Sequence, residues 1–226
     1  MGYTESLFTA FAAWSLYASL TGRWVWAGTL ASLAGLTRPA GVALAAAVSL
    51  GALLALRRGF SWRTVAGGLL APLGWLSYVG WVGLRLGRWD GYFAVQELWH
   101  NHVDGGAYTL RRLDDHFIDD STPELFLILV SLVLVASALL FVRCVLDHQP
   151  LVLLVFTGLL LAIVLSSGGV YFSRARFLLP SFPLLLPLAV LLARASLRHA
   201  VAWVVGVAVA AAYCGGYMVL VWPSAP

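Results

Sequence analysis

Residues 24–56 read WVWAGTLASLAGLTRPAGVALAAAVSLGALLAL, an apolar run of 33 residues whose single charge is Arg38. At about 1.5 Å of rise per helical residue, this run is too long to cross a hydrocarbon core about 30 Å thick only once. Arg23 stands before the run and a pair beginning at Arg57 stands after it. Because short cytoplasmic loops collect basic residues, both ends are expected on the same side of a membrane. The chain is therefore predicted to cross twice and to turn at residues 37–39.

The composition of the whole chain agrees with a membrane protein. Hydrophobic residues make up 61% and charged residues 11% of the 226 residues, and the mean hydropathy is +0.89. A soluble domain carries about 25% charged residues. All 14 basic residues are arginine, and the positive balance comes from arginines near the ends of apolar runs, which favours a role in membrane topology over nucleic-acid binding. The arginine-rich, lysine-free composition is typical of GC-rich bacteria, so the bacterial plasma membrane is the expected location.

The same reasoning applied along the chain predicts an all-α polytopic bundle of about eight transmembrane helices. Residues 1–84 are expected to hold four of them, residues 85–123 a long extracytoplasmic loop, and residues 124–226 the other four. Residues 150–193 repeat the opening pattern, because a long apolar run is again broken by arginines, here Arg174 and Arg176. Both termini are then expected on the extracytoplasmic side.

Within the long loop, the sequence predicts a short amphipathic helix at the membrane interface. Apolar and aromatic side chains recur there at helical spacing, at Tyr92, Val95, Trp99 and His102. The polar side of this helix is expected to face a cavity with Gln96, Glu97 and His100. Aromatic residues near the outer boundary, such as Trp75 and Tyr78, are expected to form an interfacial belt rather than a platform for sugars.

The loop also leaves a metal site open as an alternative. The patterns HxHxD at residues 100–104 and DDH at residues 114–116 could supply imidazole and carboxylate ligands to a divalent ion. Their spacing matches no strong zinc pattern. A solvated acidic loop is the favoured interpretation, and no cofactor is predicted.

Four charged residues are predicted at the membrane edge, together on the outer side: Glu5, Arg38, Arg174 and Arg176. Charges at this depth are costly, so they are candidates for function. Guanidinium groups hold phosphate in a bidentate fork that lysine does not reproduce. The three arginines among them are therefore predicted to bind the phosphate of a lipid-linked donor whose tail stays in the bilayer. The alternative is a structural role, in which they anchor helix ends or pair with one another.

Several short segments resemble a known family. Residues 3–8 (YTESLF) and residues 28–36 leading into 37–41 (TRPAG) resemble bacterial members of the C-type (GT-C) glycosyltransferase superfamily, with the closest similarity to the PIG-V-like mannosyltransferases. Residues 93–99 (FAVQELW) and 174–183 (RARFLLPSFP) are similar to the outer loop and the late arginine–proline segment of the same family. The similar segments follow the family's order along most of the chain.

The resemblance implies a function on the outer membrane face. Members of the family transfer a sugar from a polyprenyl-phosphate donor to a lipid or glycan acceptor, with inversion at the anomeric carbon. A carboxylate acts as general base, and basic residues hold the departing lipid phosphate. By position, Glu5 is the first candidate for the catalytic carboxylate. The resemblance assigns substrate binding to Arg38, Gln96, Trp99, Arg174 and Arg176.

One feature of the family has no counterpart at the expected place. The presumed catalytic aspartate lies in an earlier outer loop with a Trp-Asp motif, and residues 1–226 start at what resembles the second outer loop. Residues 89–92 (WDGY) resemble that motif in a later position, which makes Asp90 the second catalytic candidate. We therefore expect either a truncated transferase or, as the alternative, a non-catalytic protein that binds polyprenyl phosphate, such as a transporter or an assembly subunit. The sugar, the acceptor, a metal requirement and the oligomeric state stay open.

Overall fold

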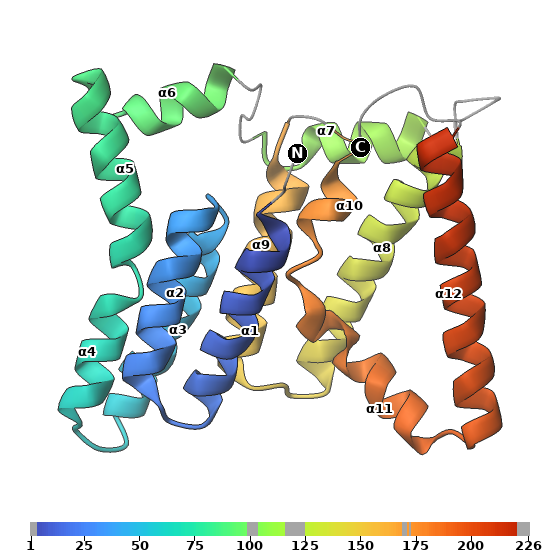
Figure 1. The fold of residues 1–226 in the computed structure, drawn as a ribbon, viewed down its shortest axis with the longest axis horizontal. Coiled ribbons are helices and arrows are strands. Elements are labelled where there is room, and N and C mark those ends of the chain that lie inside the picture. Colours follow the sequence, from blue (N-terminus) through green and yellow to red (C-terminus); the bar gives the residue numbers. More distant parts are fainter. Residues whose placement is uncertain (1–3, 99–103, 116–124, 169–170, 172, 221–226) are drawn as a thin grey trace.

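The computed structural model describes residues 4–98, 104–115, 125–168, 171 and 173–220 (Figure 1). This described part is helical and contains no strand, which confirms the predicted all-α class. The helices are α1 (Glu5–Leu20), α2 (Trp24–Thr37), α3 (Gly41–Leu56), α4 (Trp62–Leu70), α5 (Leu73–Leu86), α6 (Gly91–Leu98), α7 (Ala107–Asp114), α8 (Leu125–Leu146), α9 (Leu151–Ser166), α10 (Arg174–Phe177), the 3-10 helix η2 (Phe182–Leu185), α11 (Leu186–Arg194) and α12 (Leu197–Leu220).

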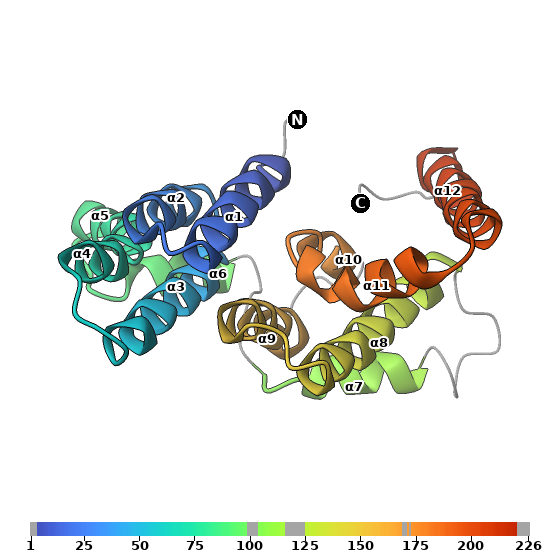
Figure 2. The same ribbon diagram turned by 90° about the horizontal axis from the view of Figure 1, so that it is seen from below.

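The helices run alternately between two faces of the molecule, an upper and a lower one in the view of Figure 1. The connections α1–α2, α3–α4, α8–α9 and α11–α12 lie at the lower face. The turn between α2 and α3 points toward the upper face, where α6 and α7 lie across the ends of the other helices. Seen from below, α9 lies between the group α1–α5 and the group formed by α8, α10 and α11 (Figure 2). This arrangement places residues that are far apart in sequence, at the start of α1 and in α10, on the same side of the molecule.

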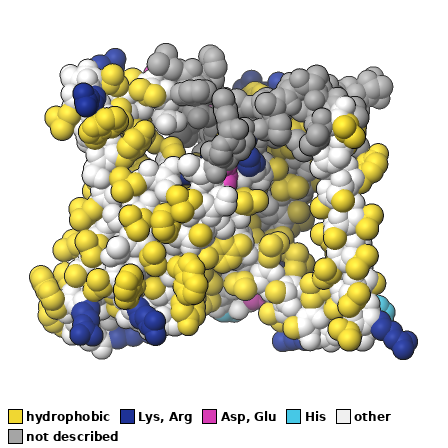
Figure 3. Space-filling view, in the orientation of Figure 1, with side chains coloured by type: hydrophobic (Ala, Val, Ile, Leu, Met, Phe, Trp, Pro, Cys, Tyr) yellow, Lys and Arg dark blue, Asp and Glu magenta, His cyan; other side chains and the backbone are white. Residues whose placement is uncertain are grey.

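Three helical segments are long and apolar enough to cross a membrane: Trp62–Leu86, Phe126–Leu146 and Leu197–Tyr217. Shorter apolar helices accompany them at Gly41–Leu56, Leu151–Ser166 and Phe182–Arg194. Large hydrophobic side chains are exposed on most helices and cover the band between the two faces, while arginines lie along the lower edge and also near the upper one (Figure 3). A surface of this kind suits lipid rather than water, which indicates a membrane protein.

Proline divides two of the predicted crossings into shorter helices. The fourth predicted helix of residues 1–84 is split at Pro72, where α4 ends and α5 begins. Between Ser173 and Arg194, the segment is irregular and consists of α10, η2 and α11, with Pro183 and Pro187 at helix starts. Proline lacks a backbone N–H and clashes with the preceding turn, so a continuous helix cannot pass through these positions undisturbed.

The first five helices pack tightly because glycines let their backbones approach. Helix α2 contacts α1, α3, α4 and α5, and α3 contacts α9. A Cβ atom on Gly28 of α2 would overlap the carbonyl oxygen of Gly67 in α4, and one on Gly74 of α5 would overlap the carbonyl oxygen of Ser32. Small residues at helix contacts are the usual means of close packing in membranes. This packing fixes the α2–α3 turn, which carries Arg38.

Candidate functional site

A cavity of about 660 Å³ lies toward the upper face, between α1, the α2–α3 turn, α5, α6, α9 and α10. Its walls are largely apolar, with Phe8 from α1, Val42 from α3 and Leu160 from α9 among them. Five of the predicted site residues line it: Glu5, Arg38, Gln96, Arg174 and Arg176. The helices thus bring together side chains that the sequence spreads over most of the chain.

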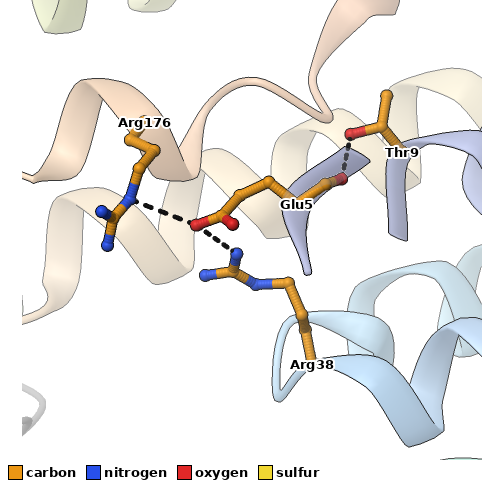
Figure 4. Close-up of polar contacts among 4 residues, drawn as sticks. All are labelled: Glu5, Thr9, Arg38 and Arg176. Atoms are coloured by element: carbon orange, nitrogen blue, oxygen red, sulfur yellow. Dashed lines mark hydrogen bonds and ion pairs between the residues drawn. The ribbon is translucent and has the colours of Figure 1, made fainter. Parts of the chain in front are cut away.

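The centre of the charged wall is an ion-pair network around Glu5. Its Oε1 lies 2.5 Å from Nη1 of Arg38 and 3.1 Å from Nε of Arg176, and the two arginines approach it from different elements (Figure 4). Glu5 is buried, with 6% of its surface exposed, and the Thr9 hydroxyl donates a hydrogen bond of 2.7 Å to its backbone carbonyl. Arg38 and Arg176, together named the arginine pair, are thereby held about one shared carboxylate oxygen.

Local backbone chemistry places the arginine pair. Arg38 ends α2 in an extended conformation (φ −150°, ψ 149°), as expected for a residue before proline. Its guanidinium lies 5.4 Å from the centre of the Phe177 ring, and the Arg176 guanidinium lies 5.4 Å from the same ring. Contacts of this type are attractive because the ring face carries negative charge. Phe177 therefore helps to hold both arginines at the cavity.

Arg174 has different surroundings, although it also lines the cavity. It is buried, with 2% of its surface exposed, and donates hydrogen bonds to the Thr109 hydroxyl and to the carbonyl oxygen of Ser167. Its guanidinium lies 5.4 Å from the ring of Tyr108 and 5.2 Å from the ring of Tyr171. Within the described residues, no carboxylate forms an ion pair with it. Arg174 is thus a structural tie between α7, α9 and α10 that also brings positive charge to the cavity.

A second part of the cavity wall is aromatic and carries one amide. Trp75 of α5 packs edge-to-face on Tyr92 of α6 at 6.0 Å, and Phe93 and Gln96 follow on the same short helix. Burial raises the pKa of the Tyr92 hydroxyl, so it stays neutral at ordinary pH. The sequence assigned Trp75 to an interfacial belt, and its place at the cavity was not predicted. Helical spacing from Gln96 back to Tyr92 was the signal that could have indicated this wall.

Asp90, the second catalytic candidate, does not line the cavity. It lies at the surface between α5 and α6 in a two-point contact with Arg88, with Arg88 Nε 3.0 Å from Oδ1 and Nη2 2.8 Å from Oδ2. These hydrogen bonds hold the pKa of the Asp90 carboxyl below its usual value. Trp99 lies outside the described residues, as does His100. Of the two described residues on the predicted polar side, Gln96 lines the cavity and Glu97 is exposed.

Among the loop residues considered as possible metal ligands, Asp104 has a structural role instead. Asp104 accepts hydrogen bonds from the backbone N–H groups of Gly106 (2.9 Å) and Tyr108 (2.7 Å) and so caps α7. His100, His102 and His116 lie outside the described residues. Among the residues that the structure describes, no group of three or more potential metal ligands occurs.

The chemistry of the cavity suits an amphiphile with an anionic head. Its described lining carries three arginines and one glutamate, an excess of two positive charges, beside largely apolar walls. An excess of positive charge in a partly buried, largely apolar cavity is costly unless an anion compensates it. Phosphate matches the guanidinium groups in charge and in hydrogen-bond geometry. In comparisons with known proteins, no family model, curated protein or solved structure matches this chain.

Proposed function

We propose that this protein is a membrane glycosyltransferase of the C type, similar to mannosyltransferases, that moves a sugar from a polyprenyl-phosphate donor to a lipid or glycan acceptor. The observation that carries the proposal is the convergence of Arg38, Arg174 and Arg176 with Glu5 around a largely apolar cavity. The positive excess suits the donor phosphate, and the apolar walls suit the polyprenyl chain.

Each part of the donor has a matching part of the cavity in this proposal. The phosphate lies at the arginine pair, Arg38 and Arg176, and the lipid chain follows the apolar side chains of α9, such as Ile163. The Gln96 amide on α6 offers a donor and an acceptor to sugar hydroxyls. Glu5 is the candidate for the general base, because its Oε2 has no hydrogen-bond partner among the described residues.

We also propose that the chain crosses the bacterial plasma membrane about eight times, with both termini and the cavity on the outer side. The alternation of the helices between two faces supports this topology. So does the position of the arginines at the lower face: Arg23, Arg57 and Arg58 lie in connections, and Arg143, Arg194 and Arg198 lie in the helix turns next to connections. Basic residues in short connections favour the cytoplasmic side.

A second candidate function is binding of polyprenyl phosphate without catalysis, as in a transporter or an assembly subunit. One observation favours it: Glu5 is the one carboxylate that lines the described cavity, and it is already paired with two arginines. Asp90 is paired with Arg88 away from the cavity. A protein of this type would bind the lipid phosphate and release no sugar.

The test is sugar transfer from a radiolabelled polyprenyl-phosphate-mannose donor by membranes that carry this chain, beside membranes that lack it. We expect release above the control, and a loss of at least about tenfold in Arg38→Ala and Arg176→Ala. Arg198→Ala is the matched control, since Arg198 is exposed at the start of α12 and far from the cavity. It should release sugar at the wild-type rate.

The outcomes separate the two candidates. Binding of the lipid phosphate without sugar release would support the non-catalytic function. Unchanged release in both single variants and in the double variant would show that the arginine pair does not hold the phosphate. Absence of both binding and release would reject both candidate functions.

A further inference from the structure

The Glu5 carboxylate already lies where the proposed function places a phosphate. Its Oε1 accepts from Nη1 of Arg38 at 2.5 Å and pairs with Nε of Arg176 at 3.1 Å, so one oxygen serves both guanidinium groups (Figure 4). The other oxygen, Oε2, is buried and has no hydrogen-bond partner in the described part of the chain. The strongest arginine–carboxylate contacts use both oxygens in parallel. Glu5 therefore keeps the arginine pair together without using its full bonding capacity.

We infer that Glu5 is a resident anion of this site, which an incoming phosphate displaces from Arg38 and Arg176. The inference rests on the proposed function, because it assumes that a phosphate binds in this cavity. A carboxylate and a phosphate in contact with the same guanidinium groups would repel each other in a poorly solvated cavity. Ligand binding is thus an exchange of one anion for another, and Glu5 lowers the affinity of the site for phosphate.

The exchange needs only a side-chain movement. Glu5 lies in the first turn of α1, and its backbone carbonyl is fixed by the Thr9 hydroxyl at 2.7 Å. The backbone of α1 can therefore stay in place while the carboxylate rotates away from the arginine pair. Phe177 contacts both guanidinium groups at 5.4 Å and can hold them while their anion changes.

Displacement also changes what Glu5 can do. While it is paired with two guanidinium groups, its negative charge is compensated and the carboxylate is a poor proton acceptor. After phosphate takes its place, the carboxylate faces the cavity without these partners and can accept the proton of an acceptor hydroxyl. A base of this kind becomes available only when a donor is bound, which protects the site from unproductive proton transfer in its absence.

The experiment is a binding measurement on the full chain in lipid nanodiscs, with farnesyl phosphate as the probe and farnesol as the uncharged control. Glu5→Gln keeps the shape of the side chain and removes its charge. We expect it to bind farnesyl phosphate about tenfold more tightly than the wild type does. Glu97→Gln is the matched control, since Glu97 is exposed on α6 and does not line the cavity. Its affinity should equal that of the wild type.

A second pair of measurements keeps the test decisive. Inorganic phosphate is used as a competitor, and displacement of farnesyl phosphate by it would show that the site recognises the phosphate group itself. Glu5→Asp retains the charge on a shorter side chain that cannot reach both arginines equally. It is expected to bind farnesyl phosphate with an affinity between those of the wild type and Glu5→Gln, and it serves in place of Glu5→Gln if that variant does not fold.

The two proposals fail in different ways. Equal or weaker binding in Glu5→Gln or Glu5→Asp, with binding by the wild type intact, would overturn the displacement and make Glu5 a positioning residue for the arginines. If the wild type and both variants bind farnesyl phosphate no better than farnesol, the proposed function itself is wrong, and the displacement falls with it.

Discussion

Arg174 and Arg176 are two positions apart, yet the structure gives them different tasks. Arg176 pairs with Glu5, whereas Arg174 turns toward Thr109 and the carbonyl oxygen of Ser167. Side chains at positions i and i+2 do not share a face of a helical turn, so the two arginines of the Arg-Ala-Arg sequence need not bind the same ligand. Thr109 also links Arg174 to α9, because the Thr109 hydroxyl donates a hydrogen bond of 2.6 Å to the Leu165 carbonyl oxygen.

Thr109→Val is expected to destabilise the protein through this tie. The substitution keeps the size of the side chain and removes the hydroxyl, which leaves Arg174 and the Leu165 carbonyl each without one partner. Such losses cost about 1–3 kcal/mol of unfolding free energy. Thr29→Val is the control, because the Thr29 hydroxyl bonds only within its own helix at an exposed position. Thermal unfolding in detergent measures the difference, and equal stabilities would contradict the structural role.

A second prediction at this scale separates the two catalytic candidates. Asp90→Asn should leave sugar transfer unchanged, because Asp90 lies outside the cavity lining and its carboxyl is held by Arg88. Glu5→Gln should abolish transfer, since the amide cannot accept a proton. The radiolabelled-donor assay checks both variants in the same membranes. Loss of transfer in Asp90→Asn with retention in Glu5→Gln would reverse the assignment.

The sequence predicted this site in part. It grouped Glu5, Arg38, Arg174 and Arg176 on one side of the molecule, and the structure brings all four to one cavity. The grouping could be predicted because charges in apolar chains are rare and because the arginine pattern predicts their side of the membrane. The pairing of Glu5 with two arginines could not be predicted from the sequence, because it depends on distances between α1, α2 and α10 that are set by helix packing.

At the scale of helices, backbone contacts through glycine decide which elements can be neighbours. Gly74 of α5 and Gly67 of α4 leave no room for a Cβ atom, whereas Gly80, also on α5, has no atom of another element within 4 Å of the Cβ position. The same helix therefore offers both a crowded and an open glycine position. Sequence alone shows the glycines but not which of them lie at a contact.

Gly74→Ala is therefore expected to lower stability by about 1–3 kcal/mol or more, because the added methyl group would overlap the Ser32 carbonyl. Gly80→Ala should leave stability equal or raise it by up to about 1 kcal/mol, since alanine favours a helix and meets no neighbour there. The measurement is thermal unfolding of both variants in the same detergent. A comparable loss in Gly80→Ala would show that helix α5 does not pack as described.

Helices lie at the long apolar runs, as the sequence predicted, but three segments are long and apolar enough to cross a membrane, so the count of about eight crossings stays a prediction. The prediction of elements was weaker where the chain was polar or contained proline. A helix lies at Gly91–Leu98, in the segment where spacing predicted one. Helix α7 was not predicted, because Ala107–Asp114 is rich in charge and its stability comes from the Asp104 cap and the contact with Arg174. The break between α4 and α5 at Pro72 follows from the missing N–H of proline. It was not predicted because Pro72 lies within a long apolar run, which was read as one helix.

For the whole molecule, the proposed topology can be tested with single cysteines. Trp89 is 91% exposed near the upper face, and Gly59 lies in the α3–α4 connection at the lower face with open space around it. In a chain with Cys144 and Cys214 replaced by alanine, Trp89→Cys should react with a membrane-impermeant thiol reagent in intact cells. Gly59→Cys should react only after the membrane is opened. Labelling of both, or of Gly59→Cys alone, would refute the topology.

The pairing of Glu5 with Arg38 also matters for how such a chain enters a bilayer. In the proposed topology, Arg38 must pass the hydrocarbon to reach the outer side, and an arginine at the centre of a membrane helix costs about 2.5–3.5 kcal/mol during insertion. Helices α1 and α2 are joined by a short connection and pack on each other, so they can insert as a hairpin that carries Glu5 and Arg38 as a neutral pair. Arg176 is synthesised much later and joins when α10 arrives. The carboxylate that is proposed to occupy the phosphate position is thus, in the proposed topology, also the counter-ion with which Arg38 crosses the bilayer.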